Sequence, residues 1–344
     1  MKRLLAFGGV VALLLTIAAV IAAIRMNDFL QSPVHVDDAG TDFEIVSGAS
    51  FGNISDDLAA RGIIDSSRMF RLYARWSGEA SAAQAGEYRI KSGTTPLDLL
   101  QQFTSGNVRL YSFTIIEGWS QWDLLSALAN DPNMDASLTE EDWPALLESL
   151  GAEYIHPEGL FLPETYRFAR NTSDREILAQ AYDAMQAILA QEWQQRAENL
   201  AITTPYEALT LASIVEKETA RADERPRIAG VFSRRLNDRM RLQTDPTVIY
   251  GIGRDFNGNL TRRDLKTDTA YNTYTRRGLP PTPIAMPGRA AIHAALHPED
   301  GEELYFVATG NDDGSHAFST TKDQHDAAVA AYLKRLRQRR RQGD

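Results

Sequence analysis

The sequence predicts an α+β fold: an N-terminal transmembrane helix, then a small strand–helix subdomain, then a larger mixed α/β domain. Three observations support this prediction. Residues 4–24 carry no charge and are numerous enough to cross a bilayer. A pattern of strand, glycine turn and helix then repeats between residues 43 and 125. Beyond residue 173 several segments have helical apolar spacing, and residues 303–308 have a strand pattern.

The first segment has the length and composition of a membrane anchor. Lys2 and Arg3 precede 21 uncharged residues, which span roughly 31 Å as a helix, and Arg25 ends the run. A cleaved signal peptide is the alternative, but its apolar region is normally about 7–15 residues long, and no clean Ala-x-Ala site precedes Arg25. We expect an uncleaved anchor at 1–25 in the cytoplasmic (inner) membrane, with the N-terminus inside and the rest extracytoplasmic. The polar segment 26–40 is expected to be a linker.

The composition excludes several kinds of site. The 344 residues contain no cysteine, so a disulfide framework, a thiolate zinc site, an iron–sulfur cluster and a cysteine nucleophile are ruled out. The net charge of −10 argues against nucleic acid as a partner, because phosphate binding needs clustered positive charge. The basic run at 335–344 is expected to be a solvated tail, with attraction to anionic envelope polymers as the alternative.

Three short strings share one local pattern. They are residues 43–50, 88–95 and 114–120, and each is a strand followed by a glycine turn and a Ser or Thr N-cap that opens a helix. Such units resemble LysM modules, which are associated with N-acetylated glycans. The alternative is that this pattern is common in many folds and indicates no ligand. We predict a LysM-like subdomain at 41–112.

The rest of the chain, 113–334, is predicted to be the larger domain. A long helix is expected to begin at Ser173, and two more are expected at about 206–222 and 228–238. Residues 278–288 contain four prolines and two glycines and cannot form regular structure. The strand at 303–308 precedes a final helix.

One carboxylate in this domain has the setting of a general acid. Glu218 extends an apolar helical stripe, whereas Glu216 is turned from it by about 200°. A carboxyl group against apolar side chains loses hydration, which raises its pKa, and a general acid at neutral pH requires this. The alternative is that the helix ends near Glu218 and its side chain reaches solvent or pairs with Arg221. The apolar residues of the stripe are Leu211, Ile214 and Val215.

Other motifs are weaker. His293 and His297 have the i, i+4 spacing of a zinc-binding helix, but Ala294 stands where the zinc-protease pattern requires Glu, and Pro298 indicates a helix end. Ser213 has no base evident in the sequence. We therefore predict no metal and no cofactor.

Several long strings follow one another along the chain. They are residues 158–166 (EGLFLPETY), 212–219 (ASIVEKET), 240–251 (MRLQTDPTVIYG), 269–274 (TAYNTY), 278–281 (GLPP), 294–298 (AALHP) and 304–307 (LYFV). In this order they resemble the endolytic murein transglycosylase family (MltG or YceG-like), and the likeness covers nearly the whole chain. One departure is Glu164, where many members have Asp.

The resemblance implies a peptidoglycan lytic transglycosylase that cleaves the β-1,4 bond between N-acetylmuramic acid and N-acetylglucosamine and leaves 1,6-anhydro ends. It implies that Glu218 is the catalytic residue, which agrees with the burial argument. It also implies peptidoglycan glycan strands as the partner and a role in ending new strands beside cell-wall synthases. Two alternatives stay open: a non-catalytic, membrane-tethered glycan-binding scaffold and a muramidase-type hydrolase. The sequence leaves open whether cutting is within strands or at their ends.

Further residues are candidates around Glu218. Glu158 and Glu164 are candidates for a supporting second carboxylate. The five candidate substrate contacts have aromatic faces, amides or a carboxylate suited to pyranose rings, and the alternative for them is a place in turns or in the core. They are Gln243, Asp245, Tyr271, Asn272 and Tyr274.

Overall fold

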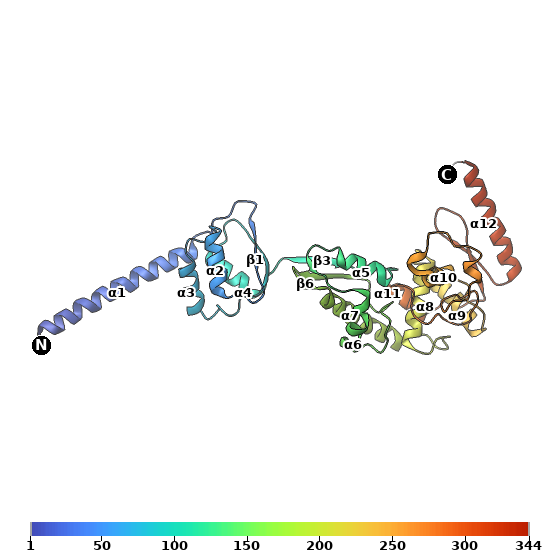
Figure 1. The fold of residues 1–344 in the computed structure, drawn as a ribbon, viewed down its shortest axis with the longest axis horizontal. Coiled ribbons are helices and arrows are strands. Elements are labelled where there is room, and N and C mark those ends of the chain that lie inside the picture. Colours follow the sequence, from blue (N-terminus) through green and yellow to red (C-terminus); the bar gives the residue numbers. More distant parts are fainter. Residues whose placement is uncertain (1, 343–344) are drawn as a thin grey trace. The chain divides into compact units, whose positions relative to one another are not determined.

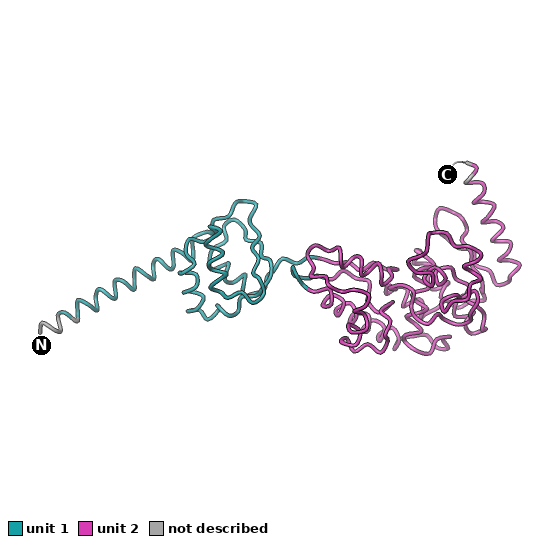
Figure 2. The backbone as a smooth tube through the Cα atoms, in the orientation of Figure 1, with its two compact units in different colours: residues 1–111, 167–172 teal, residues 112–166, 173–344 magenta. Residues whose placement is uncertain are grey.

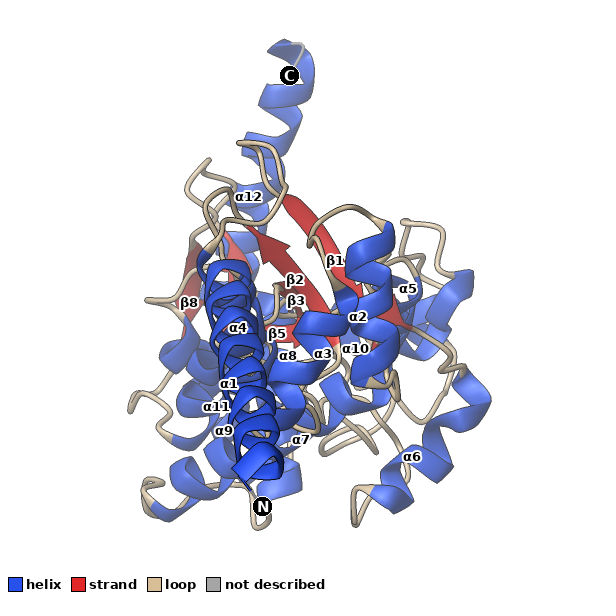
Figure 3. Cartoon of the chain, turned by 90° about the vertical axis from the view of Figure 1, so that its left-hand side faces the viewer, coloured by secondary structure: helices blue, strands red, loops and turns tan. Residues whose placement is uncertain are grey.

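The computed structural model describes residues 2–342, and its chain forms two compact units (Figures 1 and 2). The first unit contains residues up to Tyr111 together with Arg167–Thr172, and the second contains Ser112–Tyr166 and the chain from Ser173 onward. Helices make up most of both units, and the strands are short (Figure 3). The structure therefore has the predicted α+β content.

The first unit begins with helix α1, Lys2–Gln31. Among the described residues, α1 is the one helix long and apolar enough to cross a membrane; the qualifying stretch is Gly9–Gln31, and its most apolar window has a mean hydropathy of 2.4 and no buried part. The helix continues six residues into the predicted linker. This continuation occurs because Phe29 and Leu30 are buried in the core of the first unit, so packing holds the last turns in place.

Two strands and three helices complete this unit. They are β1 (Thr41–Ile45), α2 (Phe51–Ala60), α3 (Ser67–Trp76), β2 (Gly86–Ile90) and α4 (Pro96–Ser105). Strands β1 and β2 pair antiparallel, with Phe43 opposite Tyr88, and both rings pack against Phe103. Ser50 and Thr95 cap α2 and α4, as the repeated pattern predicts.

Paired short strands and helices come next along the chain, and β3, β5 and β6 each have residues in both units. Strand β3 pairs with β5, and β4 with β6. The predicted caps are confirmed at Ser120, which caps α5, and at Ser173, which caps α7. The elements are β3 (Leu110–Thr114), α5 (Gln121–Ala129), β4 (Met134–Asp135), the 3-10 helix η1 (Glu140–Asp142), α6 (Trp143–Ser149), β5 (Thr165–Ala169), β6 (Thr172–Ser173) and α7 (Asp174–Gln194).

Helix α8, Pro205–Glu218, lies at the centre of the second unit. It packs against α7, α9, α10 and α11, and every residue from Ala208 to Val215 is buried. Its end is earlier than the predicted Ala222, because Thr219 is already extended. The surrounding elements are α9 (Arg225–Asn237), α10 (Asp245–Ile252), η2 (Gly253–Asp255), η3 (Asp264–Lys266) and α11 (Arg289–Leu296).

The chain ends with a hairpin and a helix. Strands β7 (Tyr305–Ala308) and β8 (His316–Ser319) pair antiparallel, and α12 (Lys322–Gln342) packs on both. The predicted tail at 335–344 is helical up to Gln342, and its last two residues lie outside the described residues. Residues 278–288 form no helix or strand, as predicted.

Candidate active site

Glu218 is the last residue of α8, and its half-buried side chain lines a cleft of about 480 Å³. The other walls of the cleft come from the hairpin β7–β8, the start of α12 and the segment that leads into α10. A carboxyl group is thus placed where a helix ends and a cavity begins. This position makes it reachable from the cleft while apolar neighbours cover much of it.

The surroundings of Glu218 favour its protonated form. Burial raises the pKa of Glu218, and the nearby charge of Asp245 adds to this, while a hydrogen bond donated by the Thr244 hydroxyl opposes it. More distant positive charge from Arg235 also lowers the pKa. The sum of these effects lies above the ordinary pKa of a glutamate, as the apolar stripe predicts.

The alternative pairing with Arg221 is not formed. The Arg221 guanidinium lies 2.7 Å from an oxygen of Asp223 and donates to the carbonyl oxygen of Asp313. The helix does end at Glu218, as that alternative assumed, but the side chain enters a cleft.

Glu216 does not lie on an exposed face, which corrects the argument that contrasted it with Glu218. Its side chain is only 5% exposed, because α9 and α11 pack on that side of α8. One oxygen lies 3.0 Å from Arg225, and the other accepts a hydrogen bond from the Gly288 amide at 2.9 Å. Glu216 therefore joins α8 to α9 and to the start of α11, and it lines neither of the clefts described here.

Three of the five predicted substrate contacts lie with Glu218 in the cleft: Gln243, Asp245 and Tyr274. The Tyr274 hydroxyl donates to Asp245 at 2.6 Å, so these two side chains form one polar edge. Gln243 has a φ of +54°, a backbone conformation that non-glycine residues seldom adopt. Such conformations concentrate at functional sites, where the surrounding structure imposes them.

The structure places the other two away from Glu218. Asn272 is buried, and its amide donates to the carbonyl oxygens of Asp264, Leu265 and Thr267, while its side-chain oxygen accepts from the Tyr274 amide. Asn272 therefore organises the loop that presents Tyr274. Tyr271 packs on Tyr250 with ring centroids 5.0 Å apart. Neither is among the described residues that line the cleft.

Sequence reasoning missed three residues near Glu218. Thr244 stands between two predicted contacts, and its hydroxyl is a recognisable donor. Arg235, on α9, is buried and donates to the carbonyl oxygens of Leu242 and Leu304, each at 2.6 Å. His316 comes from β8, almost a hundred residues later, and Glu224 holds its Nδ1 at 2.7 Å. No local pattern marks Arg235 or His316.

A second cleft, of about 510 Å³, lies beside the first. At two places in the chain, neighbouring residues line different clefts. Glu218 lines the first cleft and Lys217 the second, and Asp245 lines the first and Pro246 the second. The second cleft is lined by three aromatic rings, together with Asp123 and Arg254. The aromatic residues are Trp122, Tyr250 and Phe256.

Glu158 lies in the interior near this second cleft. Its side chain has no exposed surface, and it accepts hydrogen bonds from the backbone amide of Gln121 and the hydroxyl of Tyr250. Burial raises the pKa of Glu158 to about 8. Glu164 is exposed. Among the described residues, neither carboxylate lines either cleft, and Asp245 is the second carboxylate in the cleft of Glu218.

The arrangement suits acid–base chemistry on a bound polymer. It combines a carboxyl group with a raised pKa, a hydroxyl donor that stabilises its ionised form, and a polar edge for hydroxyl groups. The described residues that converge as metal ligands are Glu192, His293 and His297, and none of them lines this cleft.

Comparison with known proteins places this geometry in a family. The model of the YceG-like family matches residues 43–331. The chain is 31% identical over 322 residues to the endolytic murein transglycosylase of Bacillus subtilis, covering 88% of each chain. It is 28% identical to the protein of that name from Streptococcus pneumoniae strain D39, covering 84% of this chain and 58% of the relative.

A solved structure agrees with these sequence matches. The crystal structure of a YceG-like protein from Listeria monocytogenes superposes with a TM-score of 0.52 at 27% identity, and the match covers 85% of this chain and 99% of that one. The family model spans most of the chain, and the string that ends at Glu218 lies within it. The chain therefore belongs to the YceG-like family.

Proposed function

We propose that this protein is a membrane-anchored lytic transglycosylase that cleaves the β-1,4 bond between N-acetylmuramic acid and N-acetylglucosamine in peptidoglycan. The observation that carries the proposal is the position of Glu218, a carboxyl group with a raised pKa at the edge of a cleft. The names of the relatives from Bacillus subtilis and Streptococcus pneumoniae support the same chemistry.

The reaction proceeds in two proton transfers. Protonated Glu218 donates to the glycosidic oxygen as the bond to C1 of the muramic acid breaks. The resulting carboxylate, which the Thr244 hydroxyl stabilises, then takes the proton from the C6 hydroxyl of the same sugar. The C6 oxygen closes onto C1, which forms the 1,6-anhydro ring and returns Glu218 to its acid form.

One carboxyl group suffices for this sequence. The nucleophile is already tethered to the sugar, so no water molecule has to be bound and activated. Acid–base assistance of this kind is typically worth about 10²–10⁴ in rate, and positioning of the sugar supplies the remainder. We assign that positioning to Gln243, Asp245 and Tyr274, which line the same cleft.

The paired clefts favour cutting within a strand. A polymer that lies across the boundary between Lys217 and Glu218 would place one sugar beside Glu218 and the next against the rings of Trp122 and Tyr250. Aromatic faces suit the apolar faces of pyranose rings, while the side chains around them bind hydroxyl groups. Cleavage at this boundary would leave sugars bound on both sides of the broken bond.

The first unit supports attachment to a membrane and to glycan. Helix α1 has the length and composition of a single span, and Lys2 and Arg3 favour a cytoplasmic N-terminus. We propose that the LysM-like arrangement of β1, α2, α3 and β2 holds the strand near its site of synthesis, so that the enzyme ends new strands beside cell-wall synthases.

The apolar surface next to α1 fits the membrane boundary. Trp76 is 80% exposed and Leu72 is 59% exposed, and both line a hollow that α1 residues Ala23, Met26 and Leu30 complete. Exposed tryptophan at the end of an apolar span is typical of the lipid headgroup region. We therefore propose that the first unit lies directly on the membrane surface.

A muramidase-type hydrolase is the second candidate, because Asp245 provides another carboxylate in the cleft. Hydrolases use two carboxyl groups, the second of which acts as nucleophile or activates water. Asp245 accepts a hydrogen bond from Tyr274 at 2.6 Å, which stabilises it as a fixed sugar contact. The products distinguish the two reactions: anhydro ends follow from transglycosylation, and reducing ends follow from hydrolysis.

The experiment uses the full chain in detergent and defined, uncrosslinked glycan strands, with mass spectrometry of the products. We expect anhydro-ended fragments from wild type and a loss of about 10²–10⁴ in rate for Glu218→Gln. Glu164→Gln is the matched control, because Glu164 is an exposed carboxylate outside the clefts. Near-normal turnover by folded Glu218→Gln would overturn the proposal, and products from neither wild type nor control would favour the scaffold alternative.

A further inference from the structure

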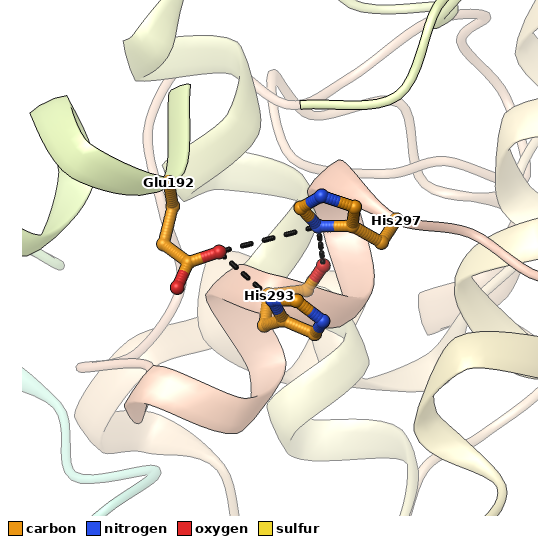
Figure 4. A group of neighbouring side chains, drawn as sticks. All are labelled: Glu192, His293 and His297. Carbon is orange, nitrogen blue, oxygen red and sulfur yellow. Dashed lines mark hydrogen bonds and ion pairs between the residues drawn. The ribbon is translucent and has the colours of Figure 1, made fainter. Parts of the chain in front are cut away.

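Three potential metal ligands from two helices meet on the second unit, away from the clefts (Figure 4). Glu192 lies in the last turn of α7, His293 lies on α11, and His297 caps the end of α11. Their ligand atoms all lie within 4.8 Å of one another. Oε2 of Glu192 is 2.8 Å from Nδ1 of His293 and 4.0 Å from Nδ1 of His297.

A polar contact behind His297 orients its ring. Nε2 of His297 lies 2.8 Å from the carbonyl oxygen of Gln195. Nδ1 of the same ring lies 3.2 Å from the carbonyl oxygen of His293 and 4.0 Å from Oε2 of Glu192. The ring therefore presents Nδ1 on the side where the Glu192 carboxylate lies.

The backbone supplies further negative potential at the same place. Both α7 and α11 end here, at Gln194 and Leu296, and the carboxyl end of a helix carries partial negative charge that favours cations. The nearest positive side chain in the sequence, Arg196, lies over the ring of Trp193 and donates to the Trp193 carbonyl oxygen. The arginine is therefore engaged elsewhere.

We propose that Glu192, His293 and His297 bind a divalent zinc-class metal ion through Oε2, Nδ1 and Nδ1. Imidazole nitrogen with one carboxylate is a donor set that zinc accepts, and calcium and magnesium prefer all-oxygen sites. The hydrogen bond from His297 to Gln195 is the outer contact that orients a metal-binding histidine. Tetrahedral zinc needs its ligand atoms about 3.3–3.5 Å apart and in the plane of each imidazole ring. The rings of His293 and His297 stack with centroids 4.2 Å apart and planes at 19°, so metal binding requires the exposed His293 ring to turn.

The metal would have a structural role and no catalytic one, since its ligands lie outside both clefts. It would join the end of α7 to the end of α11, and α11 packs along α8, the helix that ends at Glu218. The first turn of α11 is tied to α8 by the Gly288 amide and Glu216. A metal ion at the carboxyl end of α11 would therefore hold both ends of this helix in place against α7 and α8, and so limit movement of α8.

The test uses the tag-free full chain, treated with chelator and then titrated with zinc chloride. We expect one saturable site by calorimetry and a rise in Tm of about 2–4 °C. His293→Asn should lower the zinc affinity at least tenfold and remove the Tm shift, and it should leave the fold intact because His293 is exposed. Calcium chloride should produce no shift.

His35→Ala is the matched control, because His35 is an exposed histidine that contacts a single carboxylate, Asp65. It should bind zinc as wild type does. The proposal is overturned if zinc does not bind at one-to-one stoichiometry, if His293→Asn binds as tightly as wild type, or if His35→Ala loses the site equally.

Discussion

The hydroxyl of Thr244 donates a hydrogen bond to Oε1 of Glu218, and so joins the segment before α10 to the end of α8. A donor to a carboxylate stabilises the ionised form and lowers the pKa, which opposes the effect of burial. Thr244 therefore opposes the rise in the pKa of Glu218. In the proposed mechanism it would also stabilise the carboxylate that the second proton transfer requires.

Thr244→Val should move the pH dependence of cleavage toward alkaline pH. A general acid works in its protonated form, so activity falls as pH rises through the pKa of Glu218. Without the hydroxyl the pKa of Glu218 lies higher, so the alkaline limb of the kcat/KM profile shifts to higher pH. Rates on defined strands at a series of pH values measure the shift. An unchanged limb would mean that Glu218 does not control it.

Asp245→Asn should move the same limb in the opposite direction. The negative charge of Asp245 raises the pKa of Glu218, so its removal lowers that pKa and the limb appears at more acidic pH. The amide keeps the size of the side chain and can still accept the hydrogen bond from Tyr274. A shift in the same direction as that of Thr244→Val would contradict this electrostatic account.

The two glutamates of α8 should differ in their effect on stability. Arg225→Met leaves Glu216 as an unpaired buried charge, and we expect unfolding free energy to fall by about 3–5 kcal/mol. Glu218→Gln replaces a carboxyl group whose ionised form burial disfavours, so stability should stay equal or rise while activity is lost. Urea unfolding followed by circular dichroism measures both. Equal destabilisation by the two changes would mean that Glu218 is also a structural residue.

Local signals in the sequence predicted local structure well. The caps at Ser50, Thr95 and Ser120 were predictable because the N-cap interaction spans only three residues. The burial of the Glu218 carboxyl group was also predictable, since this residue extends an apolar stripe; its catalytic role stays a prediction. The contrast between Glu216 and Glu218 failed, because a helix that is buried on nearly every side also buries a residue turned away from its apolar stripe.

Contacts between distant segments were not predictable from one sequence. His316 on β8 and Arg235 on α9 line the same cleft only once the chain has folded, and their neighbours in the chain give no sign of it. The pair His293 and His297 was correctly placed at a helix end, but Glu192 stands about a hundred residues earlier, and only folding brings it alongside.

Trp76 should contact lipid when the full chain is placed in a bilayer. In nanodiscs made with brominated phospholipid, bromine quenches the fluorescence of tryptophan that lies within the lipid. We expect Trp76→Phe to remove most of the quenchable signal, because Trp76 is 80% exposed beside the end of the apolar span. Trp193→Phe is the control, since Trp193 lies on α7 in the other unit. Equal quenching in both variants would place Trp76 away from the membrane.

Glu158 should make the stability of the protein decrease with rising pH. Burial raises its pKa from 4.5 to about 8 in the folded chain, so between these values the folded state keeps a proton that the unfolded state has lost. The stabilisation is complete below about pH 4.5 and declines as pH rises toward 8, by at most about 1.4 kcal/mol per pH unit. Glu158→Gln keeps an acceptor for the Gln121 amide but does not titrate.

Urea unfolding of wild type and Glu158→Gln at several pH values isolates this contribution, because all other titrating groups are common to both proteins. We expect the variant to become more stable relative to wild type between about pH 5 and about pH 8, with little further change in their difference at lower pH. A difference that stays constant across that range would show that Glu158 is ionised in the folded protein. The Tyr250 hydroxyl and the Gln121 amide would then hold a buried carboxylate in place of a neutral acid.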